Sequence, residues 1–343
     1  MKILILGGAG FIGSHLVDKL VALGEEVGVF IKPNTKIWRI KHHIEEKNIK
    51  IHIGDILNFK QVKKAMTKYN YAINLVALLH HPKKGYTYKT NYFSALNTFK
   101  AALDTKIKKV VHTSTAHVLF KPPIIHDNTN QLYSFQTEYS AGKIAAELLA
   151  QKFIRKKKLN ISIIRPTITF GPRDNKGLTL LILMTYNGIL PIITANPNTK
   201  INPIYIADLV DGYIKVIEEE NTETYTFAGK TVVTIKDMIN YAAKQGRKIP
   251  PLKYITHKTT KKIIKLVEKI PINTPIPKEA NIYQPFYKTN IYTWQKTRKK
   301  LKWTPKNTTY QAIQKTTQWI KQNKLTKPTT IIKYIQQKAY RKN

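Results

Sequence analysis

A glycine loop within the first 13 residues limits the fold more than any other feature of the sequence. The apolar run Lys2–Leu6 leads directly into this loop, and Ile12–Leu23 after it carries apolar side chains near helical spacing. In such a strand–loop–helix unit one glycine permits a tight turn, one lets backbone approach a pyrophosphate, and one lets the helix pack closely on the strand. The helix N-terminus adds free N–H groups and partial positive charge. The sequence therefore predicts a dinucleotide site whose phosphates lie at Gly7, Gly10, Phe11, Ile12 and Gly13.

The first half of the chain alternates short β-branched runs with amphipathic helical stretches. This alternation predicts an α/β fold with a Rossmann-type, doubly wound parallel sheet, because parallel strands are buried on both faces and read as continuous apolar runs. We expect a dinucleotide-binding domain over 1–170, a smaller substrate-binding region over 171–325 partly interleaved with the sheet, and a basic tail over 326–343. The further expected strands are Val27–Ile31, Ile49–Ile53, Tyr71–Val76 and Lys109–Thr113, and the further expected helices are Phe59–Lys68 and Asn91–Thr105.

The composition excludes several classes of protein. With 42% hydrophobic and 10% aromatic residues, the chain of 343 residues can bury a sizeable core and is not wholly disordered. It contains no cysteine, which excludes disulfides, iron–sulfur clusters, thiolate zinc sites and a cysteine nucleophile. No metal site is predicted.

The net charge of +38 is unevenly distributed, since residues 231–343 hold 26 basic and only 3 acidic side chains. We favour a chain-wide compositional bias together with an anionic small-molecule ligand, because the lysines are scattered singly and in pairs. Binding to a nucleic acid or a membrane surface is the less favoured alternative. The stretch 258–270 (KTTKKIIKLVEKI) is a candidate basic amphipathic helix for anionic lipid, although a solvated helix is the favoured interpretation.

No targeting or membrane-spanning segment is evident in the sequence. The first residues run straight into the glycine loop, and the most apolar later stretch, Leu178–Ile193, is interrupted by Asn187, Gly188 and Pro191. We therefore expect a cytoplasmic protein.

The residues after the second and third strands bear on which cofactor is bound. A carboxylate after the second strand would bind the adenosine ribose of NAD, but the chain has Lys32-Pro33-Asn34-Thr35 there. Lys32 can meet a 2′-phosphate, which favours NADP over NAD without excluding NAD. Asp55, followed by Ile56, is placed to accept a hydrogen bond from adenine, and a simple loop cap is nearly as good an interpretation of it.

A tyrosine and a lysine four residues apart provide the candidate chemistry. Tyr139 and Lys143 share one face of a predicted helix, so the ammonium can favour the phenolate of a side chain whose ordinary pKa is near 10. Thr115 follows the strand Lys109–Thr113, where a hydroxyl can hold a substrate carbonyl or alkoxide. Such a set suits proton transfer at a secondary alcohol or ketone.

These segments occur in the order seen in a known family. The chain resembles the extended short-chain dehydrogenases/reductases, the NAD(P)-dependent epimerase/dehydratase superfamily, over about residues 1–325. The matching segments are GGAGFIGSH, GD at 54–55, LVA at 75–77, Asn91, VVHTSTA at 110–116, YSAGK, RPTITFGPRDN at 165–175, IYIAD at 204–208 and LKWTP at 301–305.

The resemblance implies roles for individual residues. It makes Tyr139 the catalytic acid/base, Lys143 its partner and Thr115 the residue that orients the substrate. It places Ala77, Asn91 and Pro166 at the cofactor, with Asn91 anchoring the central helix. It also implies a homodimer through helices near 91–105 and 139–155. The chain departs from the family pattern at Leu6, Asn74 and Leu119-Phe120.

Two further departures limit the reaction. Ala116 and His117 stand where sugar dehydratases carry an Asp-Glu pair, which disfavours 4,6-dehydration, and His117 is interpreted as a strand-end neighbour rather than a base. Ile201 stands where nucleotide-sugar enzymes usually carry an arginine. The sequence thus leans to a reductase resembling dihydroflavonol reductase and 3β-hydroxysteroid dehydrogenase. A nucleotide-sugar 4-epimerase with tightly bound NAD, or a non-catalytic cofactor-binding subunit docked on a polyanion or membrane, is the alternative. The small-molecule partner is expected to be a sugar, a nucleotide sugar or a hydrophobic ketone or alcohol.

Overall fold

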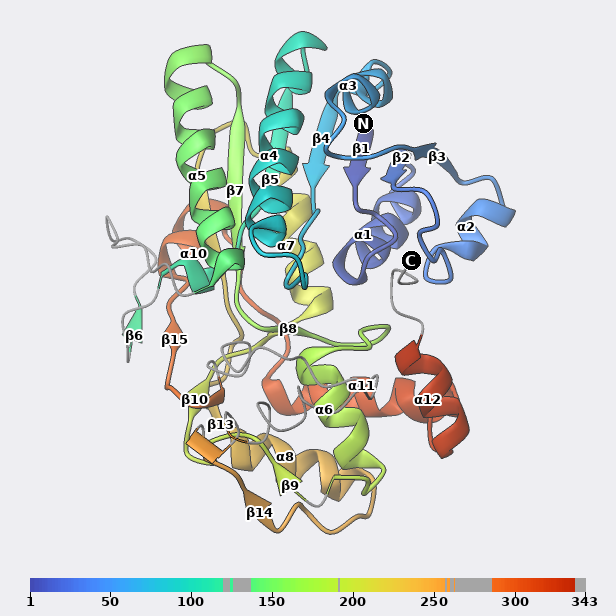
Figure 1. Ribbon diagram of the computed structural model, residues 1–343, viewed down its shortest axis with the longest axis vertical. Coiled ribbons are helices and arrows are strands. Elements are labelled where there is room, and N and C mark those ends of the chain that lie inside the picture. The colour runs from blue at the N-terminus through green and yellow to red at the C-terminus, as the bar shows by residue number, and fades with distance from the viewer. Residues whose placement is uncertain are drawn as a thin grey trace.

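A parallel sheet of seven strands forms the upper part of the molecule (Figure 1). The computed structural model describes residues 1–119, 124–125, 137–190, 192–256, 258–259, 262 and 286–336. The strand order β12-β7-β5-β4-β1-β2-β3 reverses direction of winding at β1, as in a doubly wound fold. The strands are β1 (Lys2–Leu6), β2 (Glu26–Ile31), β3 (Ile49–Ile53), β4 (Tyr71–Asn74), β5 (Lys109–Thr113), β7 (Ile161–Pro166) and β12 (Thr224–Phe227).

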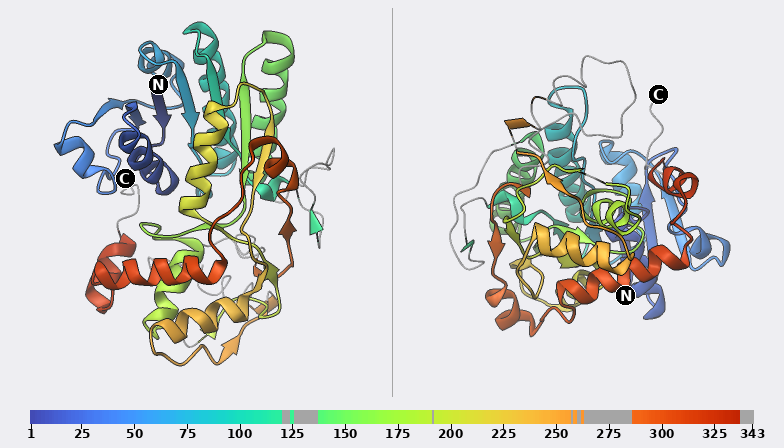
Figure 2. Two further views of the ribbon diagram at one scale, coloured as in Figure 1. Left: turned by 180° about the vertical axis from the view of Figure 1, so that it is seen from behind. Right: turned by 90° about the horizontal axis from the view of Figure 1, so that it is seen from below.

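Helices cover both faces of this sheet. On one face α3 (Phe59–Met66), α4 (Tyr86–Asp104) and α5 (Glu138–Lys157) pack side by side, and Phe99 and Ala146 are among their buried side chains. On the other face lie α1 (Phe11–Ala22) and α7 (Ile206–Glu218), as the view from behind shows (Figure 2). The predicted fold class is thus confirmed.

The predicted strands β1, β3 and β5 have the expected bounds, and β4 ends two residues earlier than expected, at Asn74. Strand β12 lies beyond residue 170 yet pairs with β7 through Thr224 and Ile163 at the sheet edge. The part of the chain after residue 170 is therefore interleaved with the sheet.

The lower part of the molecule sits against the carboxyl ends of the strands. Its core continues from the α1–α7 side of the sheet through buried residues such as Leu183, Met238 and Ile313. Its helices are α6 (Gly177–Tyr186), α8 (Ile235–Gln245), α10 (Gln295–Leu301), α11 (Thr309–Gln322) and α12 (Pro328–Gln336). Its short strands pair as β8 (Thr169–Phe170) with β11 (Ile204–Tyr205), β9 (Ile192–Ile193) with β14 (Lys253–Tyr254), β10 (Lys200–Ile201) with β13 (Val233–Thr234), and β15 (Ile291–Tyr292) with β6 (Ile124–Ile125).

The segment expected as a basic tail begins with a packed helix. In α12, Ile331 and Tyr334 are buried, and the main-chain oxygen of Tyr334 accepts a hydrogen bond of 3.2 Å from Asn175. The apolar residues of this segment recur at helical spacing, which is why it packs although it is basic. Residues 337–343 lie outside the described residues, as does the candidate basic amphipathic helix over 258–270 apart from 258–259 and 262.

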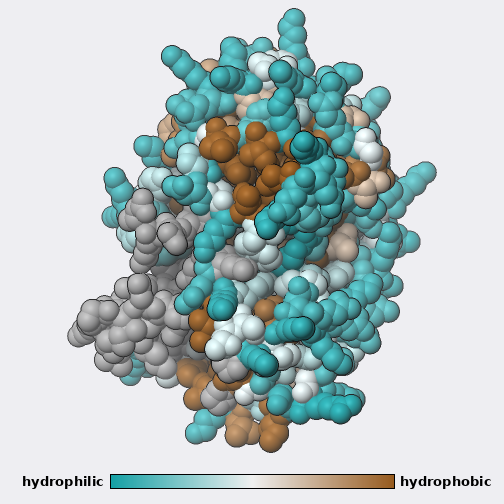
Figure 3. Space-filling view, turned by 90° about the vertical axis from the view of Figure 1, so that its right-hand side faces the viewer, coloured by the Kyte–Doolittle hydropathy of each residue, from teal (hydrophilic) through white to brown (hydrophobic). Residues whose placement is uncertain are grey.

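The face seen from the side is mostly hydrophilic with local apolar patches (Figure 3). Among the described residues, no helix combines the length and the apolar character needed to cross a membrane.

Candidate functional site

The glycine loop connects β1 to α1 in a conformation that leaves little room for side chains. Gly7 has a φ of +88°, and Gly10 N donates a hydrogen bond of 3.0 Å to Gly7 O. A Cβ on Gly13 would lie 2.6 Å from both Gly7 O and the Cα of Gly8. Only glycine therefore fits at position 13, and the backbone of the loop stays free of side chains that would block a ligand.

The first turn of α1 fits an anion. Its N-cap is Gly10, which provides no side-chain acceptor, and the turn contains no acidic residue. Its N–H groups and helix dipole are thus open to a phosphate. Phe11 and Ile12, both partly exposed, flank the same turn. The loop and the helix end fit the pyrophosphate of a dinucleotide.

Lys32 and Asp55 follow the ends of two neighbouring strands. Lys32 is exposed directly after β2, and its carbonyl accepts a hydrogen bond of 2.7 Å from the hydroxyl of Thr35, which closes a turn. Asp55 is exposed, and its Oδ1 accepts a hydrogen bond of 2.9 Å from Leu57 N. Ile56 is buried beside it. The contact with Leu57 is the loop-capping role that the sequence left open for Asp55.

Asn91 fixes the loop after β4. Its Nδ2 donates to Leu78 O at 2.8 Å and to Thr87 O at 2.9 Å, while its Oδ1 accepts from Leu78 N at 3.1 Å. Ala77, which precedes Leu78, is exposed. A single carboxamide thus joins the interior of α4 to the main chain of the loop that carries Ala77.

Thr115, Tyr139 and Lys143 come together at the carboxyl end of β5. Thr137 caps α5, since its hydroxyl accepts a hydrogen bond of 3.1 Å from Ser140 N, and this fixes Tyr139 in the first turn of the helix. The phenol of Tyr139 is close enough to Thr115 for the threonine hydroxyl to lower the pKa of the phenol. Lys143, one turn further along α5, is buried and donates to Thr113 O at 2.8 Å and to Val76 O at 3.2 Å.

The ionisation of Tyr139 and Lys143 differs from the sequence-based expectation. Burial raises the pKa of the Tyr139 phenol to about 12, against a smaller lowering by the hydroxyl of Thr115. Burial also lowers the pKa of Lys143 to about 8, against an opposing effect of Glu147. The ammonium of Lys143 donates to two main-chain carbonyls. Desolvation is therefore the largest effect on the pKa of the Tyr139 phenol. In this state Tyr139 is a proton donor at neutral pH.

A buried ion pair lies next to Lys143 on the same helix. Glu147, one turn further along α5, is fully buried and forms a bidentate ion pair with Arg165. The Nε of Arg165 lies 2.9 Å from Oε1 of Glu147. Glu147 was not among the predicted residues, although its spacing of four from Lys143 on a predicted helix was a usable signal.

A small, mostly apolar cavity lies beside His117, which contacts Thr115. The ring of His117 lines it, and its Nδ1 lies 3.2 Å from the hydroxyl of Thr115. Burial lowers the pKa of His117 to about 4, so the imidazole is neutral. Asn290, also in the wall, has a buried Oδ1 with no hydrogen-bond partner in the described structure. The other lining residues are Thr167, Ile168, Ile201, Asn202, Pro203 and Tyr292.

Pro166 lies at the end of β7, directly before this wall, and is buried. Asn202 holds the wall together, because its side chain pairs with Tyr292 N at 3.1 Å and Tyr292 O at 2.8 Å. The structure thus brings β7, β15 and the segment after β10 to the reactive side of Thr115. No motif in the sequence indicated that Asn290 and Tyr292 would lie there.

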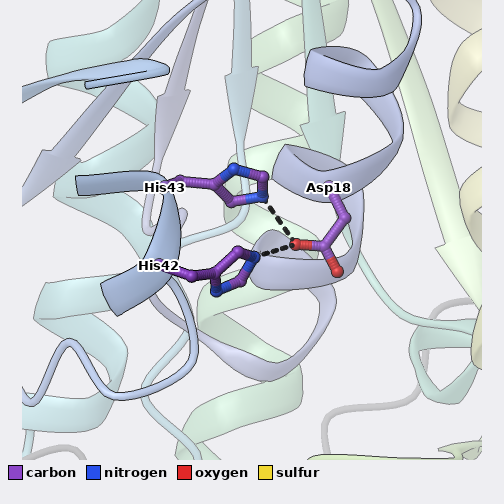
Figure 4. A group of neighbouring side chains, drawn as sticks. All are labelled: Asp18, His42 and His43. Carbon is purple, nitrogen blue, oxygen red and sulfur yellow. Dashed lines mark hydrogen bonds and ion pairs between the residues drawn. The ribbon is translucent and has the colours of Figure 1, made fainter. Parts of the chain in front are cut away.

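A polar cluster joins α1 to α2 (Lys41–Glu45), as Figure 4 shows. Arg173 joins the same cluster to the segment after β8. Asp18 Oδ1 lies 2.9 Å from His43 Nε2 and 3.6 Å from His42 Nε2. Its other oxygen pairs with Arg173, and the arginine holds the pKa of Asp18 below its ordinary value against the opposing effect of burial. With both oxygens engaged, Asp18 acts here as a structural anchor.

Comparison with known proteins agrees with this geometry. Residues 3–228 match the NAD dependent epimerase/dehydratase family. The chain belongs to this family. The predicted membership of the epimerase/dehydratase family is thus confirmed.

Two curated relatives illustrate the range within the family. Sterol-4-alpha-carboxylate 3-dehydrogenase, decarboxylating, from Homo sapiens is 26% identical over 232 residues, which cover 66% of this chain and 60% of that protein. UDP-glucuronic acid decarboxylase 5 from Arabidopsis thaliana is 29% identical over 273 residues, covering 70% of this chain and 75% of that protein. The chain thus spans about 60% of the length of the sterol relative.

Solved structures share the fold. UDP-glucuronic acid 4-epimerase from Bacillus cereus, crystallised with NAD, superposes with a TM-score of 0.77 at 20% identity, covering 95% of this chain and 100% of that one. dTDP-glucose 4,6-dehydratase from Streptomyces venezuelae superposes with the same TM-score of 0.77 at 17% identity, covering 94% and 98%.

Proposed function

We propose that this protein is an NAD(P)-dependent oxidoreductase that interconverts a secondary alcohol and a ketone, with Tyr139 as the acid/base. The observation that carries the proposal is the placement of Tyr139 beside Thr115, one helical turn from the buried Lys143. A substrate oxygen placed beside the phenol and the threonine hydroxyl can exchange a proton with one while the other donates a hydrogen bond to it.

The cofactor supplies the hydride chemistry when bound, and this chain's residues do the rest. Gly7, Gly10 and Gly13 shape the phosphate site, and the first turn of α1 offers its N–H groups there. Lys143 supplies a donor beside Tyr139, and Ala77 and Pro166 follow the ends of β4 and β7. We assign the adenosine end to Lys32, whose positive charge suits a 2′-phosphate and so favours NADP over NAD.

The favoured direction is ketone reduction. A phenol whose pKa is about 12 carries its proton at neutral pH, so it is ready to protonate an oxyanion as that charge develops. His117 and Asn290 give the adjoining cavity neutral hydrogen-bonding groups, and Ile201 contributes no charge. These features support a reductase of the dihydroflavonol reductase and 3β-hydroxysteroid dehydrogenase type, as does the similarity to the sterol dehydrogenase.

Cofactor titration tests the proposal. NADPH and NADH are titrated by fluorescence into wild-type protein, Tyr139→Phe and Lys32→Glu, after any nucleotide released by denaturing the purified protein has been identified. We expect reversible binding with NADPH tighter than NADH, a reversed preference in Lys32→Glu, and unchanged binding in Tyr139→Phe. Reduction of a panel of ketosteroids and other hydrophobic ketones should then be lost in Tyr139→Phe.

Two other results would redirect the assignment. Protein that arrives with NAD that does not exchange would contradict the reductase and support a nucleotide-sugar 4-epimerase, the alternative favoured by the similarity to UDP-glucuronic acid decarboxylase. Protein that binds neither nucleotide would contradict any catalytic role and leave a non-catalytic subunit.

A further inference from the structure

Two short segments form an exposed apolar tip at the end of the molecule farthest from the sheet, where β9 and β14 lie (Figure 1). Ile249 and Leu252 are 81% and 82% exposed, more than any other large apolar side chain in the described part of the chain. Ile189 and Ile192, in the neighbouring segment, are 41% and 43% exposed. Single exposed aliphatic side chains are common, but four in two adjoining loops are not explained by that general tendency.

Close backbone and side-chain contacts hold the two segments side by side. A Cβ on Gly246 would meet Tyr186 O at 1.9 Å, and one on Gly188 would meet the side chain of Lys248 at 3.1 Å. Further along, Ile192 pairs with Lys253 between β9 and β14. The segment with Ile189 and Ile192 therefore lies beside the segment with Ile249 and Leu252, and we call residues 248–253 the KIPPLK tip.

The backbone of the tip is held in place. Lys248 N donates a hydrogen bond of 3.0 Å to Ala243 O, so the chain leaves α8 in a fixed direction. Pro250 and Pro251 then restrict φ between Ile249 and Leu252, and Pro251 is buried. Ile255 N donates to Ile193 O at 2.7 Å on the far side. The two exposed side chains are presented by a supported turn.

Positive charge surrounds the aliphatic side chains. Lys244, Arg247, Lys248 and Lys253 are all exposed, and residues 186–193 and 244–256 contain no Asp or Glu. Lys258 and Lys262, the next described cations, are exposed as well. Apolar side chains that protrude between cations match the boundary between anionic headgroups and acyl chains of a bilayer.

We propose that the KIPPLK tip docks the protein on an anionic lipid bilayer, with Ile249 and Leu252 inserted at the headgroup–acyl boundary and the cations on the headgroups. A second copy of the chain is disfavoured at this surface because it would bring the same cations together. A nucleic acid would meet aliphatic side chains, which offer no stacking platform for bases. This inference does not depend on the proposed function.

Vesicle co-sedimentation of the full chain tests whether the tip binds anionic lipid. It uses phosphatidylcholine vesicles with and without phosphatidylglycerol at low and high salt. We expect binding only with phosphatidylglycerol, weakened by salt. Ile249→Ser/Leu252→Ser keeps every charge and should bind about tenfold more weakly. Lys248→Gln/Lys253→Gln should bind about 25-fold more weakly, since each of the two cations near the surface contributes roughly fivefold.

Matched controls separate the tip from the overall charge of the protein. Leu23→Ser/Ile332→Ser removes exposed aliphatic side chains elsewhere, and Lys152→Gln/Lys156→Gln removes exposed cations from α5. Neither should change binding more than about twofold. If Lys152→Gln/Lys156→Gln weakens binding as much as the tip variants, or if Ile249→Ser/Leu252→Ser binds like wild type, the attraction belongs to the whole polycation and the proposal is overturned. Absence of binding to any vesicle overturns it too.

The absence of cysteine offers a direct readout of insertion. Leu252→Cys introduces the one thiol of the chain, which can carry an environment-sensitive fluorophore. A blue shift on phosphatidylglycerol vesicles is expected at this position and none at a Leu23→Cys control. Equal spectra at the two positions would contradict insertion even if the protein sediments with vesicles.

Discussion

The Nζ of Lys143 lies 2.8 Å from the carbonyl oxygen of Thr113, the last residue of β5. This contact links the helix that carries Tyr139 to the strand that leads to Thr115. Yet the ammonium is buried, and burial lowers its pKa to about 8 from an ordinary 10.5. Because the unfolded chain binds the additional proton between pH 8 and 10.5, folding stability should rise with pH across that window.

Lys143→Met should therefore raise the free energy of unfolding at pH 7 by roughly 1–3 kcal/mol while abolishing ketone reduction. Urea denaturation monitored by circular dichroism measures the first effect. Lys152→Met, the same change at an exposed position of α5, should alter stability by less than about 0.5 kcal/mol. A destabilised Lys143→Met would show that the bonds to Thr113 and Val76 outweigh the cost of burying the charge.

Asn91 provides a second quantitative test. Asn91→Leu removes three hydrogen bonds to main-chain groups of Leu78 and Thr87, so the free energy of unfolding should fall by roughly 2–4 kcal/mol. The loop after β4 should loosen as well, and nucleotide affinity should fall with it. Thermal unfolding and nucleotide titration measure the two effects.

Asn97→Leu is the matched control, because Asn97 lies on the same helix and donates a single hydrogen bond, 2.9 Å long, to Ile56 O. It should cost about 1 kcal/mol. Equal losses in the two variants would mean that Asn91 is no special anchor of the loop.

Elements encoded by consecutive residues could be predicted from the sequence, whereas contacts between distant segments could not. The glycine loop, β1, β3 and β5 could be predicted because strand, turn and helix preferences are encoded in consecutive residues. The wall of the cavity could not, since Asn290 reaches it from a segment whose side chains have no periodic pattern. The raised pKa of Tyr139 could not be predicted for a related reason, because desolvation of the phenol depends on tertiary packing rather than on residues close in sequence.

The contact between His117 and Thr115 predicts a positioning role. His117→Ala removes the partner 3.2 Å from the Thr115 hydroxyl, so kcat should fall about five- to tenfold, as expected for a hydrogen bond worth roughly 1 kcal/mol. His117→Asn can place an amide atom near the position of Nδ1 and should restore most of the loss. Steady-state kinetics on the best ketone of the panel measure both variants.

The pH profile distinguishes this role from acid/base catalysis. Since the pKa of His117 is about 4, its ionisation should contribute no step to log kcat between pH 5 and 8, in wild type or in His117→Asn. A step in that range that disappears on substitution would make His117 a proton-transfer group instead.

Asp174 makes the stability of the protein depend on pH. Its carboxyl is buried, accepts a hydrogen bond of 3.2 Å from Lys176 N, and has a pKa raised by burial to about 7 from an ordinary 3.8. The folded protein holds this proton between about pH 4 and 7 while the unfolded chain releases it, so this group's contribution to stability should fall as pH rises through that window. Asp174→Asn should remove this dependence and stabilise the protein at pH 8 by on the order of 1 kcal/mol or more.

Asp55→Asn, an exposed change that keeps the oxygen facing Leu57 N, is the control and should leave the pH profile of stability as in wild type. Unfolding midpoints in urea from pH 5 to 8 measure all three proteins, and a parallel profile for wild type and Asp174→Asn would show that another group carries the pH dependence.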